Sequence, residues 1–180
     1  MDSTTSSPIS IDAEQVQKES AELTILGAGA WGTALAQLVE KNDHTVCLWS
    51  RRAAITLAEA VAGSHVILSA VSMKGVPAVA AQLKAAGIPR ETILVTATKG
   101  LDPETTRTPS QIFQDTFPDN PVVVLSGPNL SKEIEKGLPS ATVAASTHPE
   151  AAEAVQYLFA SEIFRVYSSP DPLGAELGGT

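Results

Sequence analysis

Gly27-Ala28-Gly29-Ala30-Trp31-Gly32 is a short glycine-rich stretch that directly follows the apolar run at residues 23–26. The segment after it consists of helix-forming residues, so the order is strand, turn and helix. In this setting Gly27 permits a tight turn, Gly29 lets a pyrophosphate approach the backbone, and Gly32 allows close packing of the helix on the strand. The stretch therefore predicts a dinucleotide-binding turn.

Short apolar runs alternate with helix-like segments along the rest of the chain. The candidate strands are residues 23–26, 45–49, 65–71, 92–96, 122–125, 141–145 and 163–167. The candidate helices between them are residues 30–40, 56–62, 77–86, 109–116, 129–135 and 149–159. This alternation is typical of a doubly wound, mostly parallel sheet, so we expect an α/β fold of the Rossmann type. After the last strand, the turn-rich residues 168–172 lead to Glu176-Leu177-Gly178-Gly179-Thr180, which supplies no clear terminal cap.

The composition indicates one packed globular domain. Of the 180 residues, 43% are hydrophobic and 18% are charged, a balance that excludes disorder of the whole chain. The net charge of −8 argues against a nucleic-acid partner. No apolar run approaches the ~18 residues of a spanning helix, so we expect a soluble, cytoplasmic protein without membrane insertion. Residues 1–20 are expected to be a flexible N-terminal extension, and residues 21–180 the dinucleotide-binding domain.

The second predicted strand ends in Trp49-Ser50-Arg51-Arg52, about where a ribose-reading residue is expected, roughly 20 residues beyond the glycine turn. The acidic residue that usually reads the ribose hydroxyl is missing. Ser50 and a neighbouring guanidinium suit a 2′-phosphate better, because arginine binds phosphate bidentately. The pattern is compatible with NADP as the cofactor as well as with NAD. The alternative is that Arg51 and Arg52 form a solvated basic corner.

Two further strand ends carry polar residues that can bind a substrate. Lys99 follows the fourth predicted strand, and Gly127, Asn129 and Ser131 follow the fifth. Open α/β sheets bind ligands at the carboxyl ends of their strands, where a lysine can hold a phosphate or a carbonyl oxygen. The alternatives are a solvated loop lysine and ordinary turn and cap residues. None of the histidines is spaced like a metal site.

Five blocks of the sequence follow one another in a characteristic order. They are Gly27-Ala28-Gly29-Ala30-Trp31-Gly32-Thr33-Ala34-Leu35-Ala36, Leu48-Trp49-Ser50-Arg51-Arg52, Ala97-Thr98-Lys99-Gly100, Leu125-Ser126-Gly127-Pro128-Asn129 and Glu176-Leu177-Gly178-Gly179. Together they resemble the bacterial NAD(P)-dependent glycerol-3-phosphate dehydrogenase family. The resemblance covers the N-terminal, cofactor-binding half of such an enzyme. It implies interconversion of dihydroxyacetone phosphate and sn-glycerol 3-phosphate by hydride transfer with NAD(P)H, in glycerophospholipid synthesis.

The resemblance also implies roles for individual residues. The cofactor side would include Gly27, Gly29, Ala30, Trp31, Gly32, Arg51, Arg52 and Ser131, the substrate side Gly127 and Asn129, and Lys99 would touch both. In the family, the proton-transferring lysine and a helical substrate domain follow the Glu-Leu-Gly-Gly block. We therefore expect no catalytic residue within the chain, with that lysine beyond Thr180, and no turnover by the fragment alone. A homodimer is the candidate state of the parent enzyme.

The chain departs from the family pattern between Arg52 and Leu57, where family members carry a longer segment. Two alternative functions also stay open. One is a different two-domain reductase of the hydroxyacid or ketopantoate type, which would lack the combination of the Lys99 and Gly127 blocks. The other is a regulatory module that senses a dinucleotide without reacting, which would leave the substrate-side blocks without a purpose.

Overall fold

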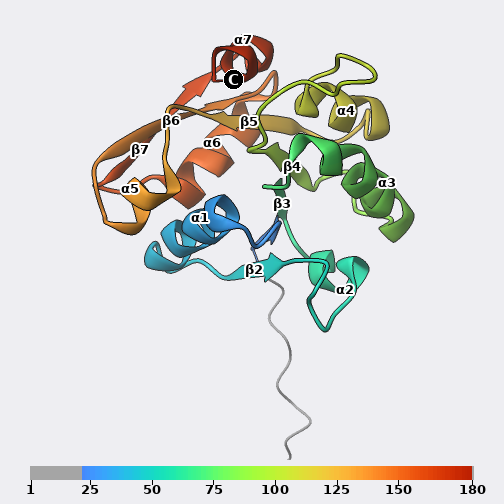
Figure 1. The fold of residues 1–180 in the computed structure, drawn as a ribbon, viewed down its shortest axis with the longest axis horizontal. Coiled ribbons are helices and arrows are strands. Elements are labelled where there is room, and N and C mark those ends of the chain that lie inside the picture. The colour runs from blue at the N-terminus through green and yellow to red at the C-terminus, as the bar shows by residue number, and fades with distance from the viewer. Residues whose placement is uncertain (1–21, 180) are drawn as a thin grey trace, which may run out of the picture.

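A seven-stranded sheet lies at the centre of the computed structural model, which describes residues 22–179 (Figure 1). The extension predicted for residues 1–20 lies outside the described residues. The strands are β1 (Leu23–Leu26), β2 (Val46–Trp49), β3 (Val66–Ser69), β4 (Ile93–Thr96), β5 (Val122–Ser126), β6 (Ser140–Ala145) and β7 (Phe164–Ser169). Their order across the sheet is β2-β1-β3-β4-β5-β6-β7.

Neighbouring strands in this sheet are parallel except for β5 and β6, which are antiparallel. The carboxyl ends of β1 to β5 therefore meet at one edge of the sheet, which we call the carboxyl edge. The amino-terminal part of β6 lies at the same edge, because Val143 pairs with Ser126 at the end of β5. In open α/β sheets this is the edge that binds ligands.

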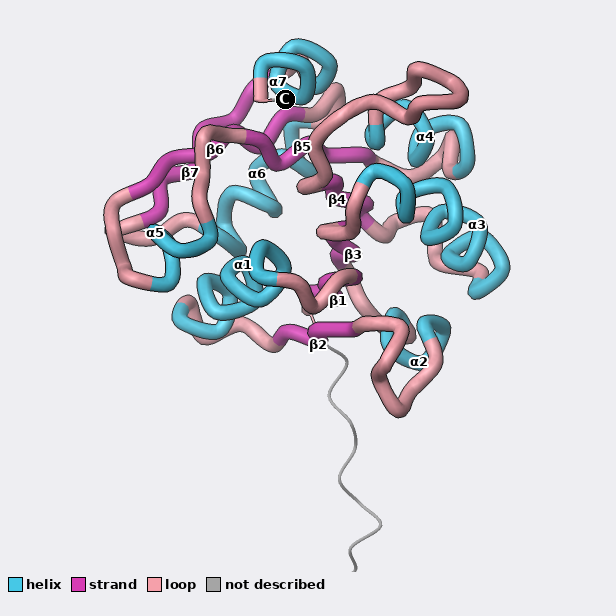
Figure 2. The backbone as a smooth tube through the Cα atoms, viewed as in Figure 1, coloured by secondary structure: helices cyan, strands magenta, loops and turns pink. Residues whose placement is uncertain are grey.

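Helices cover both faces of the sheet (Figure 2). They are α1 (Ala30–Lys41), α2 (Leu57–Val61), α3 (Val76–Ala86), α4 (Pro109–Thr116), α5 (Ser131–Glu135), α6 (Pro149–Phe159) and α7 (Pro172–Gly178), with a short 3₁₀ helix at Met73–Gly75. On one face lie α1, α5 and α6, and on the other α2, α3 and α4. Helix α7 packs against β5, β6 and α4. Within residues 22–179 no helix is both long and apolar enough to span a membrane.

Burial on both faces explains the mainly apolar sequences of the central strands β1, β3, β4 and β5. In β1, Leu23 and Ile25 belong to the core cluster that contains α1 and α6, whereas Leu26 belongs to the cluster that contains α2, α3 and α4. Successive side chains of a strand point to opposite faces of the sheet, and helices cover both faces, so apolar side chains are favoured at successive positions. Thr24 is the buried polar exception, and its Oγ1 donates to the carbonyl oxygen of Ala60 at 2.9 Å.

Helix α7 is not among the helices predicted from the sequence. It begins at the N-cap Asp171, whose Oδ1 accepts a hydrogen bond from the N–H of Gly174 at 2.8 Å, with Pro172 in the first turn. An aspartate followed by proline is a helix-start signal. Turn-forming residues around Asp171 mask that signal in the sequence.

Helix α5 is shorter than predicted. It begins at Ser131 instead of Asn129, because Leu130 is the N-cap and has an extended backbone with φ −109° and ψ 127°. Asn129 therefore lies in the loop between β5 and α5, at the carboxyl edge.

Candidate functional site

The glycine turn after β1 requires glycine at two positions. Gly27 has φ +120°, and a Cβ on it would lie 2.8 Å from the carbonyl oxygen of Ala70. A Cβ on Gly32 would overlap the carbonyl oxygen of Gly27. Both obstacles are backbone atoms, so neither can move aside as a flexible side chain would. The turn is also tied to β2, because the N–H of Gly27 donates to the carbonyl oxygen of Trp49 at 2.8 Å.

The space around Gly29 is free, unlike the space around Gly27 and Gly32. Among the described residues, no atom lies within 4 Å of a Cβ built on Gly29. Gly29 is the N-cap of α1, and the first turn, which begins with Ala30 and Trp31, carries no acidic residue. The first backbone N–H groups of a helix lack partners within the helix, and the helix dipole favours an anion at this end. The turn therefore fits the pyrophosphate of a dinucleotide.

Arg51 and Arg52 lie in an exposed turn directly after β2. The turn is closed by a hydrogen bond from the N–H of Ala53 to the carbonyl oxygen of Ser50 at 2.9 Å. Because β2 pairs with β1 and ends beside it, the turn lies next to the glycine turn at the carboxyl edge. Two guanidinium groups are thus available for a phosphate beside the first strand.

Lys99 extends from the end of β4 to the loop after β5. Its side chain is exposed, and its Nζ donates to the carbonyl oxygen of Gly127 at 3.2 Å. The backbone before it is held in place, because Thr98 Oγ1 donates to the carbonyl oxygen of Val71 at 2.8 Å. An ammonium group has three donors. The bond to Gly127 therefore orients Lys99 and leaves it capacity to bind a ligand.

Gly127 and Asn129 are packed against each other in that loop. A Cβ on Gly127 would lie 2.8 Å from Nδ2 of Asn129 and 2.9 Å from the carbonyl oxygen of Ala141. Nδ2 of Asn129 is buried and has no hydrogen-bond partner among the described residues. Leaving a buried amide donor unpaired costs free energy. This donor is therefore a candidate for a hydrogen bond to a ligand.

Two cavities at the carboxyl edge share Lys99 and Gly127. The first has a volume of about 260 Å³ and is also lined by Trp31, Asn129 and Ser131. The second, of about 530 Å³, is completed by Ser126 of β5 and by residues of α7 and its end, including Gly178 and Gly179. The structure thus brings the start of α1 and the ends of β4 and β5 together around one lysine.

The predicted site residues fall into two groups in the structure. Trp31, Lys99, Gly127, Asn129 and Ser131 line the smaller cavity together. Arg51 and Arg52 line neither of the two cavities, since they follow β2 on the far side of β1 and β3. The glycine turn lies between these groups, as a site for an extended ligand with two ends requires.

Glu176 has a structural role that the sequence does not reveal. Its side chain is buried, and its carboxylate accepts hydrogen bonds from the N–H of Ser110 at 3.0 Å and from Ser110 Oγ at 2.5 Å. Ser110 lies in the first turn of α4, where a negative charge is favourable. The contact ties α7 to α4 and so holds Gly178 and Gly179 at the larger cavity. The partners are 66 residues apart, and no local pattern links them.

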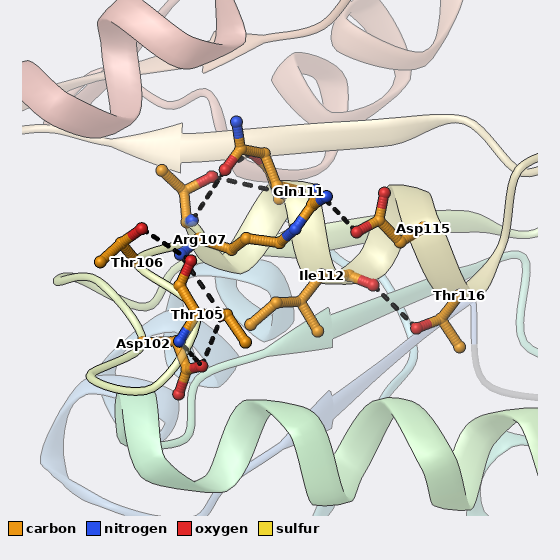
Figure 3. Close-up of polar contacts among 10 residues, drawn as sticks. Asp102, Thr105, Thr106, Arg107, Gln111, Ile112, Asp115 and Thr116 are labelled. Atoms are coloured by element: carbon orange, nitrogen blue, oxygen red, sulfur yellow. Dashed lines mark hydrogen bonds and ion pairs between the residues drawn. The ribbon is translucent and has the colours of Figure 1, made fainter.

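The loop between Lys99 and α4 is held by its own polar contacts (Figure 3). The buried carboxylate of Asp102 accepts hydrogen bonds from the N–H and Oγ1 of Thr105, at 3.0 Å and 2.6 Å. Arg107 forms an ion pair with Asp115 of α4 at 2.7 Å. The loop is therefore anchored to the helix that Glu176 contacts, and Lys99 and α7 belong to one framework.

Known dehydrogenases are similar to this chain in both sequence and fold. A family model described as NAD-dependent glycerol-3-phosphate dehydrogenase N-terminus matches residues 22–57 and 52–152. The glycerol-3-phosphate dehydrogenase (NAD(P)+) of Acaryochloris marina is 60% identical over 158 residues, which are 88% of this chain and 51% of that protein. The one of a Synechocystis strain is 60% identical over 159 residues, 88% of this chain and 50% of that protein.

A solved structure of a glycerol-3-phosphate dehydrogenase is similar to this chain in fold. The crystal structure of glycerol-3-phosphate dehydrogenase from Coxiella burnetii has a TM-score of 0.83 and 27% sequence identity, and the match covers 89% of this chain and 57% of that chain. The chain spans about half the length of the curated relatives it matches. The two segments matched by the family model overlap at residues 52–57, where we expected a segment shorter than in the family.

Proposed function

Because the chain belongs to the family of NAD-dependent glycerol-3-phosphate dehydrogenase N-terminal domains, we propose that residues 21–180 form the NAD(P)-binding domain of such an enzyme. The whole enzyme interconverts dihydroxyacetone phosphate and sn-glycerol 3-phosphate by reversible hydride transfer and serves glycerophospholipid synthesis. It acts in the cytoplasm, with a homodimer as the candidate state. The proton-transferring lysine and the helical substrate domain belong to the half of the enzyme that this chain does not span.

On the cofactor side, the open backbone at Gly29 supports a bound pyrophosphate. The N–H groups at Ala30 and Trp31 hold this anion at the start of α1, and Gly27 and Gly32 keep the turn tight enough for it. Arg51 and Arg52 hold the adenosine end, with a 2′-phosphate as the group that they suit best. At the other end Trp31 and Ser131 line the cavity beside Lys99.

On the substrate side, the observation that carries the proposal is the sharing of Lys99 and Gly127 by two cavities. The smaller cavity faces the start of α1, and the larger one leads to α7. When bound, the nicotinamide supplies the hydride. The ammonium of Lys99 stabilises the negative charge that develops on the carbonyl oxygen. Asn129 Nδ2 donates a hydrogen bond to the substrate, and the lack of a Cβ on Gly127 leaves room for this amide group.

The binding test uses the chain itself. NADH and NADPH are first titrated into the chain by calorimetry. In a separate titration, dihydroxyacetone phosphate is added to the complex of the chain with the oxidised cofactor. Unphosphorylated dihydroxyacetone is the matched ligand control, and Lys99→Met is the matched protein control. We expect nucleotide binding in both proteins, and weaker binding of the phosphorylated ketone to the Lys99→Met variant.

The reaction test compares this chain with a chimera that continues after Thr180 with the C-terminal half of the Acaryochloris marina relative. We expect both proteins to bind NADH, and only the chimera to oxidise it with dihydroxyacetone phosphate. A folded chimera that binds NADH and leaves dihydroxyacetone phosphate unreduced would overturn the proposed substrate.

A further inference from the structure

Trp49, at the end of β2, holds two parts of the nucleotide side of the site. Its indole is buried and belongs to the core cluster that also contains Leu26 and Leu57. The indole Nε1–H donates to the carbonyl oxygen of Ile55 at 3.0 Å. Its own carbonyl oxygen accepts the N–H of Gly27 at 2.8 Å. One residue thus fastens the glycine turn through its backbone and the returning chain through its side chain.

The arginine turn, residues 50–53, lies between these two attachment points. The N–H of Ala53 donates to the carbonyl oxygen of Ser50 at 2.9 Å, and the N–H of Arg52 donates to Ser50 Oγ at 3.3 Å. The side chains of Arg51 and Arg52 are exposed. The hydrogen bond of Trp49 to Ile55 closes the loop just beyond the turn, so it limits the directions in which the two arginines can extend.

We propose that Trp49 is a positioning residue for recognition of a 2′-phosphate. This inference rests on the proposed dinucleotide function. Bidentate binding of a phosphate requires a guanidinium in a defined orientation, and a loop fixed before binding loses less entropy when the ligand arrives. NADPH carries a phosphate at that position and NADH a hydroxyl. The bond from Trp49 to Ile55 therefore strengthens NADPH binding more than NADH binding.

The test removes the indole donor and measures nucleotide selectivity. Trp49→Phe keeps an aromatic ring in the core and removes the N–H group. Replacement of Trp49 by 3-benzothienylalanine at an amber codon keeps the bicyclic shape and removes only that donor, so it serves if Trp49→Phe fails to fold. Loss of one hydrogen bond that orders the turn should raise the Kd for NADPH roughly 3- to 10-fold. The Kd for NADH should change less than about 2-fold, because NADH lacks the phosphate.

The controls separate this inference from the proposed function. Asn120→Ala removes hydrogen bonds to the carbonyl oxygens of Pro89 and Thr92 at the other end of the sheet, and we expect it to leave the ratio of the two Kd values unchanged. Arg51→Ala and Arg52→Ala should together lower the selectivity for NADPH.

Equal loss of NADH and NADPH affinity on removal of the indole donor would overturn the inference, since a purely structural residue would act that way. Unchanged Kd values for both nucleotides would overturn it too. The arginine variants show separately whether the turn binds the 2′-phosphate. Binding of neither nucleotide by the unaltered chain would instead contradict the proposed function.

Discussion

Replacing Gly29 by alanine is expected to remove dinucleotide binding and to leave the fold intact. The backbone at Gly29 has φ −83° and ψ 179°, which alanine adopts without strain, and the added Cβ would meet no atom of residues 22–179 within 4 Å. Alanine is a poorer N-cap than glycine, which lowers the free energy of unfolding. Alanine also reduces the conformational entropy of the unfolded chain, which raises it. These two effects offset, so the free energy of unfolding should change by less than about 0.5 kcal/mol.

The binding loss follows from the space that the methyl group takes. In the proposed complex the pyrophosphate approaches the backbone at Gly29, and a methyl group there holds it away from the N–H groups at the start of α1. Losing two hydrogen bonds to a charged phosphate costs about 3 kcal/mol, or roughly 100-fold in Kd. Fluorescence titration with NADH measures the affinity, and urea denaturation measures the stability.

Gly32→Ala is the matched control, because the same methyl group there overlaps the carbonyl oxygen of Gly27. We expect it to lower the free energy of unfolding by about 1–3 kcal/mol or more. A Gly29→Ala variant that binds NADH as tightly as the unaltered chain, or that is as unstable as Gly32→Ala, would contradict the proposed role of Gly29.

Substitutions at three further positions test other parts of the structure. Lys99→Met should weaken binding of dihydroxyacetone phosphate about 10-fold or more, because the positive charge is lost. The free energy of unfolding should change by less than about 0.5 kcal/mol, since the side chain is exposed. Calorimetry measures the binding and urea denaturation the stability, and unchanged binding would contradict the proposed role of Lys99. Glu176→Ala removes the acceptor of the hydrogen bonds from Ser110 N–H and Oγ and should lower the free energy of unfolding by about 2 kcal/mol. Glu176→Gln should lower it less. Equal stability of the two variants in urea denaturation would contradict the role of these hydrogen bonds. Asn120→Ala should cost about 1–3 kcal/mol in the same assay with unchanged NADH affinity, and a changed affinity would count against the separation of these regions.

The sheet and the glycine turn could be predicted because local patterns encode both. Two-sided burial makes β1, β3 and β5 read as apolar runs, and glycine and proline mark their limits. The meeting of Lys99 with Gly127 follows as well, since their strands are parallel neighbours that end at one edge. Residues placed by periodicity and chain direction are therefore within reach of sequence reasoning.

Other features depend on contacts that no local pattern records. The reversed direction of β6, which brings Ala141 against Gly127, is set by pairing with β5. The position of α7 depends on a hydrogen bond between the buried carboxylate of Glu176 and Ser110 at the start of α4, 66 residues away. That Nδ2 of Asn129 has no hydrogen-bond partner in the described part of the chain becomes visible only when the atoms around it are placed. Such features combine distant segments, and their sequence signals are single ordinary residues.

The order of the strands also separates two traits that mutation can alter. The arginine turn follows β2, whereas Lys99 follows β4, with β1 and β3 between them. Three strand spacings amount to about 14 Å, beyond the range at which substitutions usually interact. Nucleotide preference and choice of carbonyl compound can therefore diverge among descendants through independent substitutions, each altering one trait while the other persists.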